Sequence, residues 1–262
     1  MRTSTGPRRR GVLGTAVAGA LGAATAGIAA APAHARTAAG GDAPRTGERL
    51  VAILLYDGFT ALDAIGPYEV LCRVPGVRVV TVGVRQTGPV RTDTGELSAV
   101  AERTLADVPA ADVLLIPGGG ARGQSAAGAD GAVQRWIRRV DRGSVWTTSV
   151  CTGSLILGAA GLLRGVPATT HWAARPLLEE TGAVWTQRRF VEHGKIITAA
   201  GVSAGIDMGL HLASRLAGDD VARAVQLGVE YDPAPPFDSG SAEKADERTK
   251  QLALKLLNDA SS

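Results

Sequence analysis

Residues 145–161 read VWTTSVCTGSLILGAAG, and the fold of the chain can be inferred outward from them. The first residues are mostly β-branched or aromatic, which favours a strand, and the last are small or apolar, which favours a buried helix. Cys151 stands between the two halves and is followed by Thr152 and Gly153. This pattern predicts a strand-to-helix turn that projects a cysteine away from the backbone.

The predicted position of Cys151 has a chemical consequence. A helix N-terminus offers unpaired N–H groups and the positive end of the helix dipole, and a thiol placed there has a pKa below the usual value of about 8.5. We therefore expect the pKa of the Cys151 thiol to be lowered, which makes this residue a candidate nucleophile. The alternative is a buried structural cysteine, which is the commoner role of an unpaired cysteine.

Length and composition indicate a globular chain. Its 262 residues, 45% of them hydrophobic and 20% charged, are enough to bury a full core, most simply in one domain. The formal net charge of +3 comes from the first 35 residues, which hold four arginines and no acidic residue. The other residues hold 24 Lys and Arg against 25 Asp and Glu, so they lack the basic excess that a nucleic-acid-binding protein needs.

The N-terminus has the pattern of an export signal. Residues 9–13 read RRGVL, which matches the twin-arginine motif, and a weakly apolar segment rich in alanine and glycine follows. Residues 33–35 read AHA, which is typical of a cleavage site. We predict a twin-arginine signal at 1–35, a flexible linker at 36–48, and an exported mature protein, extracellular or periplasmic, with no membrane contact after cleavage. A Sec signal and a retained membrane anchor are the alternatives.

From residue 50 onward the pattern alternates between strands and helices. The apolar run at 50–56 is typical of a parallel strand buried on both faces. Repeated β-α units predict an α/β fold with a doubly wound, mostly parallel sheet and helices on both faces. The expected elements include strands at 77–84 and 112–116, a hairpin at 89–102, and helices at 66–73, 132–141, 172–181, 203–216, 219–231 and 243–258.

Ligands of such sheets bind beyond the carboxyl ends of the strands. This edge brings together Asp63, which follows the first strand, Gly119 and Gly120, which follow a later one, and Cys151. Glycines let backbone N–H groups approach a substrate closely, so we expect those of Gly119 and Gly120, with that of Thr152, to bind developing negative charge. The alternative for the two glycines is an ordinary turn.

Four stretches of the chain resemble one known family. SVCTGSLILGAAGLL (149–163), ATTHW (168–172), LDAIGPYEVL (62–71) and EYDPAPPFDSGS (230–241) are similar to the ThiJ/PfpI superfamily, related to class I glutamine amidotransferases, and within it to bacterial isonitrile hydratases. The resemblance spans residues 49–241, and a C-terminal helix and tail follow at 242–262. It implies a flavodoxin-like fold with a nucleophile elbow, a homodimer, no metal and no organic cofactor.

The resemblance and the position of single residues imply roles for them. Cys151 matches the nucleophile, and Thr152 stands where peptidase- and amidase-like members have histidine. Asp63 matches an acid that faces the nucleophile, and Asp207 matches a further acid. His171 follows a strand end, where it would polarise the thiol. Structural roles compete with these: Asp63 as a helix cap, Asp207 as an acid in the middle of its helix that is satisfied by His211, and His171 as a packed side chain.

Isonitrile hydration fits these residues. An isonitrile, R–N≡C, has a terminal carbon that accepts a proton and then becomes electrophilic. Asp63, held protonated by desolvation, would donate the proton, the Cys151 sulfur would attack to give a thioimidate, and water would release an N-substituted formamide. The sequence therefore predicts an isonitrile hydratase-like lyase that acts on a small molecule.

Two other classes of function stay open. Regulators with this fold sense small molecules, but only one helix is expected after residue 240, which argues against an attached DNA-binding region. Deglycase-, glyoxalase- or chaperone-like stress proteins also carry an elbow cysteine, usually facing glutamate. The second cysteine, Cys72, is expected to pack in the core rather than to bridge to Cys151.

Overall fold

The computed structural model describes residues 47–260 and Met1. The predicted signal at 1–35 and nearly all of the predicted linker at 36–48 lie outside the described residues, and both stay predictions. Contacts group Gly41–Ser262 into one compact unit, to which every helix and strand below belongs. Within residues 47–260, none of the helices combines the length and the apolarity that a membrane span requires.

A central sheet of seven strands organises this unit, in the order β10-β11-β7-β6-β1-β2-β5. Neighbouring strands run parallel, except for the hairpin of β10 and β11 at one edge. The predicted doubly wound, mostly parallel sheet is thus confirmed. The strands are β1 (Arg49–Leu55), β2 (Val77–Gly83), β5 (Arg103–Thr104), β6 (Val113–Ile116), β7 (Trp146–Val150), β10 (Phe190–His193) and β11 (Ile196–Ala199).

The middle of the sheet is apolar for a topological reason. A strand with parallel neighbours and helices on both faces has no side that meets solvent. Residues 51–55 of β1 and all of β6 are accordingly fully buried. The register pairs Ile53 with Leu115 and Leu115 with Thr148, so β1, β6 and β7 end at the same edge of the sheet.

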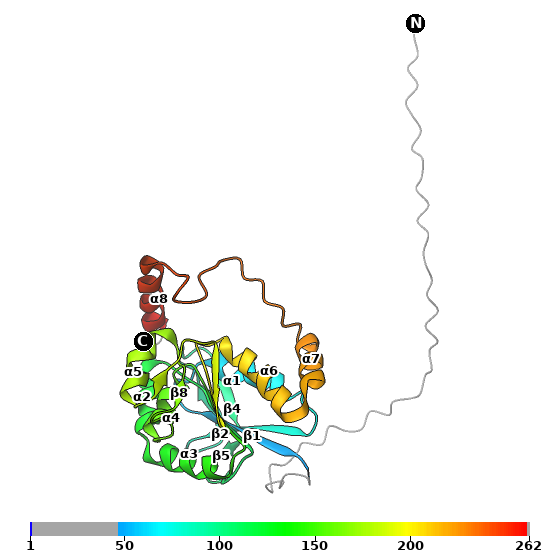
Figure 1. Ribbon diagram of the computed structural model, residues 1–262, viewed down its shortest axis with the longest axis vertical. Coiled ribbons are helices and arrows are strands. Elements are labelled where there is room, and N and C mark those ends of the chain that lie inside the picture. The colour runs from blue at the N-terminus through cyan, green and yellow to red at the C-terminus, as the bar shows by residue number, and fades with distance from the viewer. Residues whose placement is uncertain (2–46, 261–262) are drawn as a thin grey trace. The chain divides into compact units, whose positions relative to one another are not determined.

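Helices cover both faces of the sheet (Figure 1). α1 packs against α6 and α6 against α7 on one face, and α2, α3 and α4 pack together on the other. Two further two-stranded sheets are formed by β3 with β4 and by β8 with β9. The remaining elements are α1 (Ala61–Leu71), β3 (Gly88–Arg91), β4 (Ser98–Ala101), α2 (Ala121–Ala129), α3 (Gly131–Gly143), α4 (Gly153–Ala159), β8 (Pro167–Ala168), the 3₁₀ helix η1 (Trp172–Ala174), α5 (Arg175–Glu180), β9 (Val184–Trp185), α6 (Ala204–Ala217), α7 (Asp219–Gly228) and α8 (Glu247–Ala260).

Glycines on α6 allow α1 and the sheet to come close. A Cβ atom on Gly205 would lie 3.1 Å from the side chain of Val150 and 3.2 Å from the ring of Pro67. A Cβ on Gly209 would lie 3.3 Å from the Cα of Pro67. The close contact fixes α1, and with it Asp63, over the carboxyl end of β7.

The start of α1 differs from the expected one. The helix begins at Ala61 rather than at residue 66, so Pro67 lies inside it and Asp63 lies in its first turn. Pro67 removes one backbone hydrogen bond from the helix, and its ring instead packs against Gly205. The helix α2 was not expected at all, because its sequence, ARGQSAAGA, has no apolar periodicity.

Four other expectations have clear outcomes. Cys72 is exposed rather than packed in the core, because it lies at the C-cap of α1. Both cysteines are free, so Cys72 does not bridge to Cys151. α8 begins at Glu247 rather than at residue 243, and none of its described side chains is buried. The expected hairpin at 89–102 is present as β3 and β4.

Candidate active site

Cys151 lies at the turn between β7 and α4, as the sequence predicts. Its φ of 57° is in the left-handed region, which a non-glycine residue rarely adopts and which is typical of a nucleophile elbow. The N–H of Cys151 donates to the carbonyl oxygens of Ala199 and Ala200, at 3.1 and 3.0 Å. Its own carbonyl accepts from the hydroxyl of Thr170 at 3.0 Å. The side chain is 6% exposed, so the sulfur is sheltered but lies at the edge of the core.

Asp63 is the acid that faces this cysteine. It lies in the first turn of α1 and is completely buried. One carboxyl oxygen, Oδ2, accepts from the N–H of Gly118 at 3.0 Å, and the carboxyl also interacts with the thiol of Cys151. The other oxygen, Oδ1, is buried without a hydrogen-bond partner among the described residues. A carboxyl group in this setting is more stable with a proton on it.

Burial dominates the protonation of the pair. It raises the pKa of Asp63 to about 7, against the opposing hydrogen bond from Gly118 and the contact with Cys151. Burial also raises the pKa of the Cys151 thiol well above its ordinary value, and the negative charge of Asp63 adds to this. The N–H groups of Val202 and Thr152 interact with the sulfur and lower its pKa, but by less. The expectation of a lowered thiol pKa is therefore wrong for the resting site, because desolvation outweighs the helix terminus.

Thr152 and the glycines of the β6 end are bonded to one another. The N–H of Gly119 donates to the hydroxyl oxygen of Thr152 at 3.0 Å, and that hydroxyl lies 3.2 Å from the carbonyl oxygen of Gly119. The N–H of Gly120 donates to the carbonyl of Gly58 at 3.0 Å. The sequence predicted that these two N–H groups bind a substrate. In the structure both are already bonded within the protein. Of the predicted donors, the N–H of Thr152 faces the sulfur.

Gly118 is the residue that lets the acid and the elbow meet. A Cβ atom on it would lie 2.6 Å from the hydroxyl oxygen of Thr152 and 2.7 Å from Oδ2 of Asp63. Both distances are too short for any side chain, so only glycine fits between the two residues. From the sequence, the glycines at this strand end were expected to bind a substrate, and the role of Gly118 in letting Asp63 and Thr152 meet was not expected.

Two groups around Cys151 were not expected from the sequence. Val202, on the loop between β11 and α6, directs its backbone N–H at the sulfur and has an unusual φ of 31°. Thr170 binds the carbonyl oxygen of Cys151. Neither has a sequence signal, because a backbone N–H carries no residue signature and threonine is common in strands and turns.

His171 has a structural position beside the site. Its Nδ1 accepts from the N–H of Ala173 at 3.3 Å, which caps η1. Its ring packs over Gly201, where an added Cβ would lie 2.7 Å from Cδ2. Burial lowers the pKa of His171, so the ring is neutral near pH 7. These contacts agree with a packed histidine, and its predicted role in polarising the thiol stays untested.

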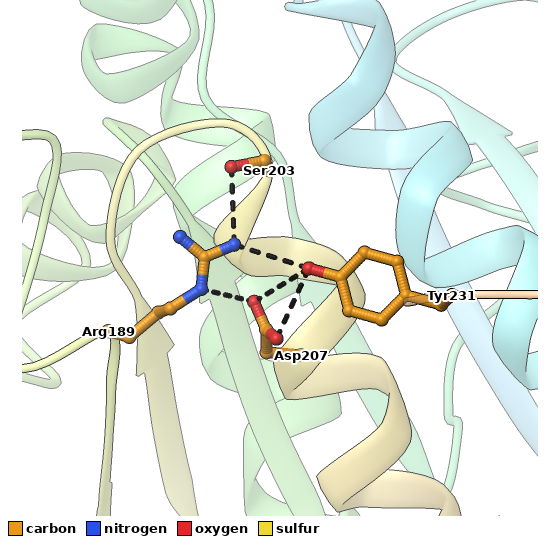
Figure 2. Close-up of polar contacts among 4 residues, drawn as sticks. All are labelled: Arg189, Ser203, Asp207 and Tyr231. Atoms are coloured by element: carbon orange, nitrogen blue, oxygen red, sulfur yellow. Dashed lines mark hydrogen bonds and ion pairs between the residues drawn. The ribbon is translucent and has the colours of Figure 1, made fainter. Parts of the chain in front are cut away.

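Asp207 forms its contacts with a separate group of side chains, shown in Figure 2. Its carboxylate pairs with Nε of Arg189 and accepts from the hydroxyl of Tyr231 at 3.3 Å. The guanidinium of Arg189 also donates to Ser203 at 3.2 Å. Asp207 lies in the first turn of α6, so it was wrongly expected in the middle of its helix. Arg189 thus ties together the segment before β10, the loop before α6 and the segment after α7.

A cavity of about 490 Å³ lies beside Cys151. Three of its lining residues contact the cysteine: Thr170, Ala200 and Val202. His171, Trp172 and Trp185 supply aromatic walls, and the chain segment at 240–243 closes another side. Within residues 47–260, no three His, Cys, Asp or Glu side chains come close enough together to hold a metal ion.

Known proteins with similar sequences include an enzyme and a transcriptional regulator. An isonitrile hydratase from Pseudomonas putida is 44% identical over 211 residues, which cover 79% of this chain and 91% of that protein. The transcriptional regulator CdhR from Pseudomonas aeruginosa is 37% identical over 102 residues, which cover 38% of this chain and 30% of the regulator.

Solved structures agree with the fold. A ThiJ/PfpI family protein from Pseudomonas syringae has a TM-score of 0.76 and 35% identity, with 82% of this chain and 91% of that chain covered. DJ-1beta of Drosophila melanogaster has a TM-score of 0.63 at 24% identity, with 71% of this chain and 100% of that chain covered, and shows a shared fold alone. The model of the DJ-1/PfpI family matches residues 49–215. This chain is therefore a member of the DJ-1/PfpI family.

Proposed function

We propose that this protein hydrates isonitriles to N-substituted formamides, with Cys151 as the nucleophile and Asp63 as the acid. The observation that carries the proposal is the buried contact between the Asp63 carboxyl and the Cys151 thiol, in a chain 44% identical to an isonitrile hydratase. The family match alone supports a hydratase-like function more broadly, since regulators are also among the relatives.

The first step adds the S–H group across the isonitrile carbon. The protonated carboxyl of Asp63 transfers its proton to the terminal carbon of R–N≡C, which makes that carbon electrophilic. The Cys151 sulfur forms a bond to the carbon as its own proton passes to the Asp63 carboxylate. The product is the thioimidate R–N=CH–S–Cys151, and Asp63 is again protonated.

The second step releases the formamide. Water adds to the thioimidate carbon, and the C–S bond then breaks. One proton from water ends on the nitrogen and the other returns to the sulfur, which gives R–NH–CHO and the free thiol. The net reaction is R–NC plus H₂O to R–NHCHO, with no oxidant, reductant or other reactant.

The geometry of the site supports these roles. Burial raises the pKa of Asp63 to about 7, so both its acid and its base forms are available near neutral pH. The N–H groups of Val202 and Thr152 point at the sulfur, where they stabilise the negative charge that develops as its proton leaves. The hydroxyl of Thr152 holds the β6 end in place and is a positioning group in this scheme.

A direct assay tests the proposal. The purified protein is incubated with cyclohexyl isonitrile, and the formamide is quantified by mass spectrometry. We expect turnover by the native protein and a loss of roughly a thousandfold or more in Cys151→Ala. Cys72→Ala is the matched control, because Cys72 is a free cysteine exposed at the end of α1, and it should retain full activity. Undiminished turnover by Cys151→Ala would refute the mechanism.

A small-molecule sensor is the second candidate, and the similarity to CdhR favours it. Under this alternative the native protein binds isonitriles or formamides but yields no product. Isothermal titration calorimetry beside the assay separates the two: binding without turnover supports the sensor, and turnover supports the enzyme.

Export and dimerisation are further proposals that rest on the sequence. The RRGVL motif and the AHA site support export by the twin-arginine route. N-terminal sequencing of secreted protein should find residue 36 first, and an intact Met1 would contradict cleavage.

The family resemblance supports a homodimer, which size-exclusion chromatography with light scattering measures directly.

A further inference from the structure

The cavity beside Cys151 has features that select a substrate. We propose that it receives the substituent R of the isonitrile and favours a bulky, planar aromatic group. This inference rests on the proposed hydration reaction. It goes further, because it names the substrate class and the residues that determine it.

The position of the cavity fits the substituent rather than the reacting carbon. Cys151 is 6% exposed, and the cavity is lined by three residues that contact it: Thr170, Ala200 and Val202. Thr170 and Ala200 bond the backbone of Cys151, and the N–H of Val202 interacts with its sulfur. In the proposed pose the carbon of a linear R–N≡C group meets the sulfur, and the substituent extends past Val202 into the cavity. The volume of about 490 Å³ lies within the range of about 300–1,000 Å³ typical of small-molecule sites, and it far exceeds what a methyl or ethyl group fills.

One wall is an indole ring held in place. Arg175 stacks on Trp185 with its guanidinium carbon 4.2 Å from the ring centroid, and Glu179 pairs with Arg175 at 3.1 Å. Arg175 does not line the cavity, whereas Trp185 does. The ring is thus fixed from outside by a cation–π contact, and it presents a flat, apolar surface to the cavity. Aromatic residues make up only 4% of the chain, yet Trp172, Trp185 and the ring of His171 gather around this one cavity.

The wall at 240–242 is thin. It consists of Gly240, Ser241 and Ala242, which have almost no side-chain bulk. The next residue, Glu243, is bonded to Gln187 and holds this segment against the body of the protein. The indole of Trp185 forms one side of the cavity, and the small residues at 240–242 form another. The space between these two sides can hold a ring larger than a single aliphatic substituent.

The charged side chains around the cavity either have polar partners or face water. Arg189 is bound by Asp207, Ser203 and Tyr231 (Figure 2). Glu243 is engaged by Gln187, and burial lowers the pKa of His171, so that ring is neutral. Arg188 lines the cavity as an exposed side chain and is therefore in contact with water. The interior thus favours an uncharged ring over an ionic group.

The test compares substrates with the same CH₂–N≡C group. They are methyl, cyclohexylmethyl and 2-naphthylmethyl isonitrile, and kcat/KM is measured for each. The native protein should prefer the naphthyl to the cyclohexyl compound by about tenfold or more. Trp185→Leu should remove this preference, because kcat/KM should fall by about tenfold for the naphthyl compound and by much less for the cyclohexyl compound. Trp146→Leu is the matched control, because Trp146 is a partly buried tryptophan on β7 that does not line the cavity.

The outcomes separate this inference from the proposed reaction. Turnover without a preference for the naphthyl substrate, or a preference that survives Trp185→Leu, overturns the inference and leaves the reaction intact. If no isonitrile is turned over, the proposed reaction fails. The cavity is then tested by calorimetry with N-(2-naphthylmethyl)formamide and N-(cyclohexylmethyl)formamide. Tighter binding of the naphthyl compound, lost in Trp185→Leu, supports the selectivity, and equal or absent binding overturns it.

Discussion

Asp63 and Asp207 have similar places in the fold and opposite surroundings. Each lies in the first turn of a helix, and these helices, α1 and α6, pack against each other. Asp63 is completely buried, and its carboxyl contacts the N–H of Gly118 and the thiol of Cys151. The side chain of Asp207 is 26% exposed and ion-paired with Arg189. The comparison teaches that burial and the nearest partner, rather than residue type or helix position, determine the surroundings of a carboxyl group, and it is burial that raises the pKa of Asp63.

The largest expected effect comes from removing the proton of Asp63. Asp63→Asn keeps the size of the side chain and an oxygen that can accept from Gly118, but it cannot protonate the isonitrile carbon. We expect kcat to fall by roughly 10²–10⁴-fold, the usual contribution of a general acid. Steady-state assays of formamide release measure this, with circular dichroism to confirm folding.

The matched variant for this comparison is Asp207→Asn. It makes the same chemical change at the first turn of α6, and kcat should stay within about threefold of the native value, because no step of the reaction uses Asp207. Equal losses of kcat in the two variants would contradict this difference between the two acids and would show that Asp207 takes part in catalysis.

The next largest effect is expected in the pH dependence of the free energy of unfolding, to which Asp63 contributes. Burial raises the pKa of Asp63 to about 7, above the unfolded value of about 3.9. Between these two values the folded state binds more protons than the unfolded state, so the contribution of Asp63 to stability is present at low pH and is lost as pH rises to about 7. The free energy of unfolding of the native protein, relative to Asp63→Asn, should fall by a few kcal/mol (~4 at most) from pH 4 to pH 7.

Urea unfolding at pH 4, 5.5, 7 and 8 measures this difference. A difference between the two proteins that is flat over this range would show that Asp63 is not held in its neutral form. The same change at Asp207, whose side chain is 26% exposed, gives the matched control series.

A smaller effect should follow from filling the space at Gly118. In Gly118→Ala the new methyl group would lie 2.6 Å from the Thr152 hydroxyl and 2.7 Å from Asp63, so one of them must move. We expect a loss of about 1–3 kcal/mol in stability from overpacking, together with reduced kcat. Gly143→Ala, at the end of α3, is the control, because no atom lies within 4 Å of its added Cβ. Similar stability and activity in both variants would contradict the tight fit.

The smallest effect is expected at the Arg189–Asp207 pair. Both side chains are partly exposed, and exposed ion pairs contribute about 0–1 kcal/mol. Arg189→Gln should therefore lower the free energy of unfolding by about 1 kcal/mol or less, measured by urea unfolding in low and in high salt. A much larger loss would show that this pair is as important to the fold as the buried acid.

The fold and the centre of the site could be predicted from the sequence for a physical reason. Buried parallel strands can be recognised in the sequence as apolar runs. Their carboxyl ends lie at one edge of the sheet, so Asp63 and Cys151 were expected near each other. The roles of these residues stay predictions until activity is measured.

Other features could not be predicted. The thiol pKa depends on how burial balances the N–H groups of Val202 and Thr152, and that balance exists only in three dimensions. The early start of α1 was missed because Pro67 is usual at a helix beginning, whereas here it packs inside the helix against Gly205. The binding of Gly119 to the Thr152 hydroxyl depends on the approach of two segments distant in sequence.

The left-handed backbone of Cys151 has an evolutionary consequence. Holding a non-glycine residue at a φ of 57° costs the native state about 1–2 kcal/mol, and glycine would adopt the same conformation without that cost. Under the proposed mechanism this strain is kept because the elbow presents the nucleophilic sulfur of Cys151. Relatives that have lost the reaction would no longer need the sulfur and could carry glycine at this elbow. Glycine at this position would then mark the loss of catalysis.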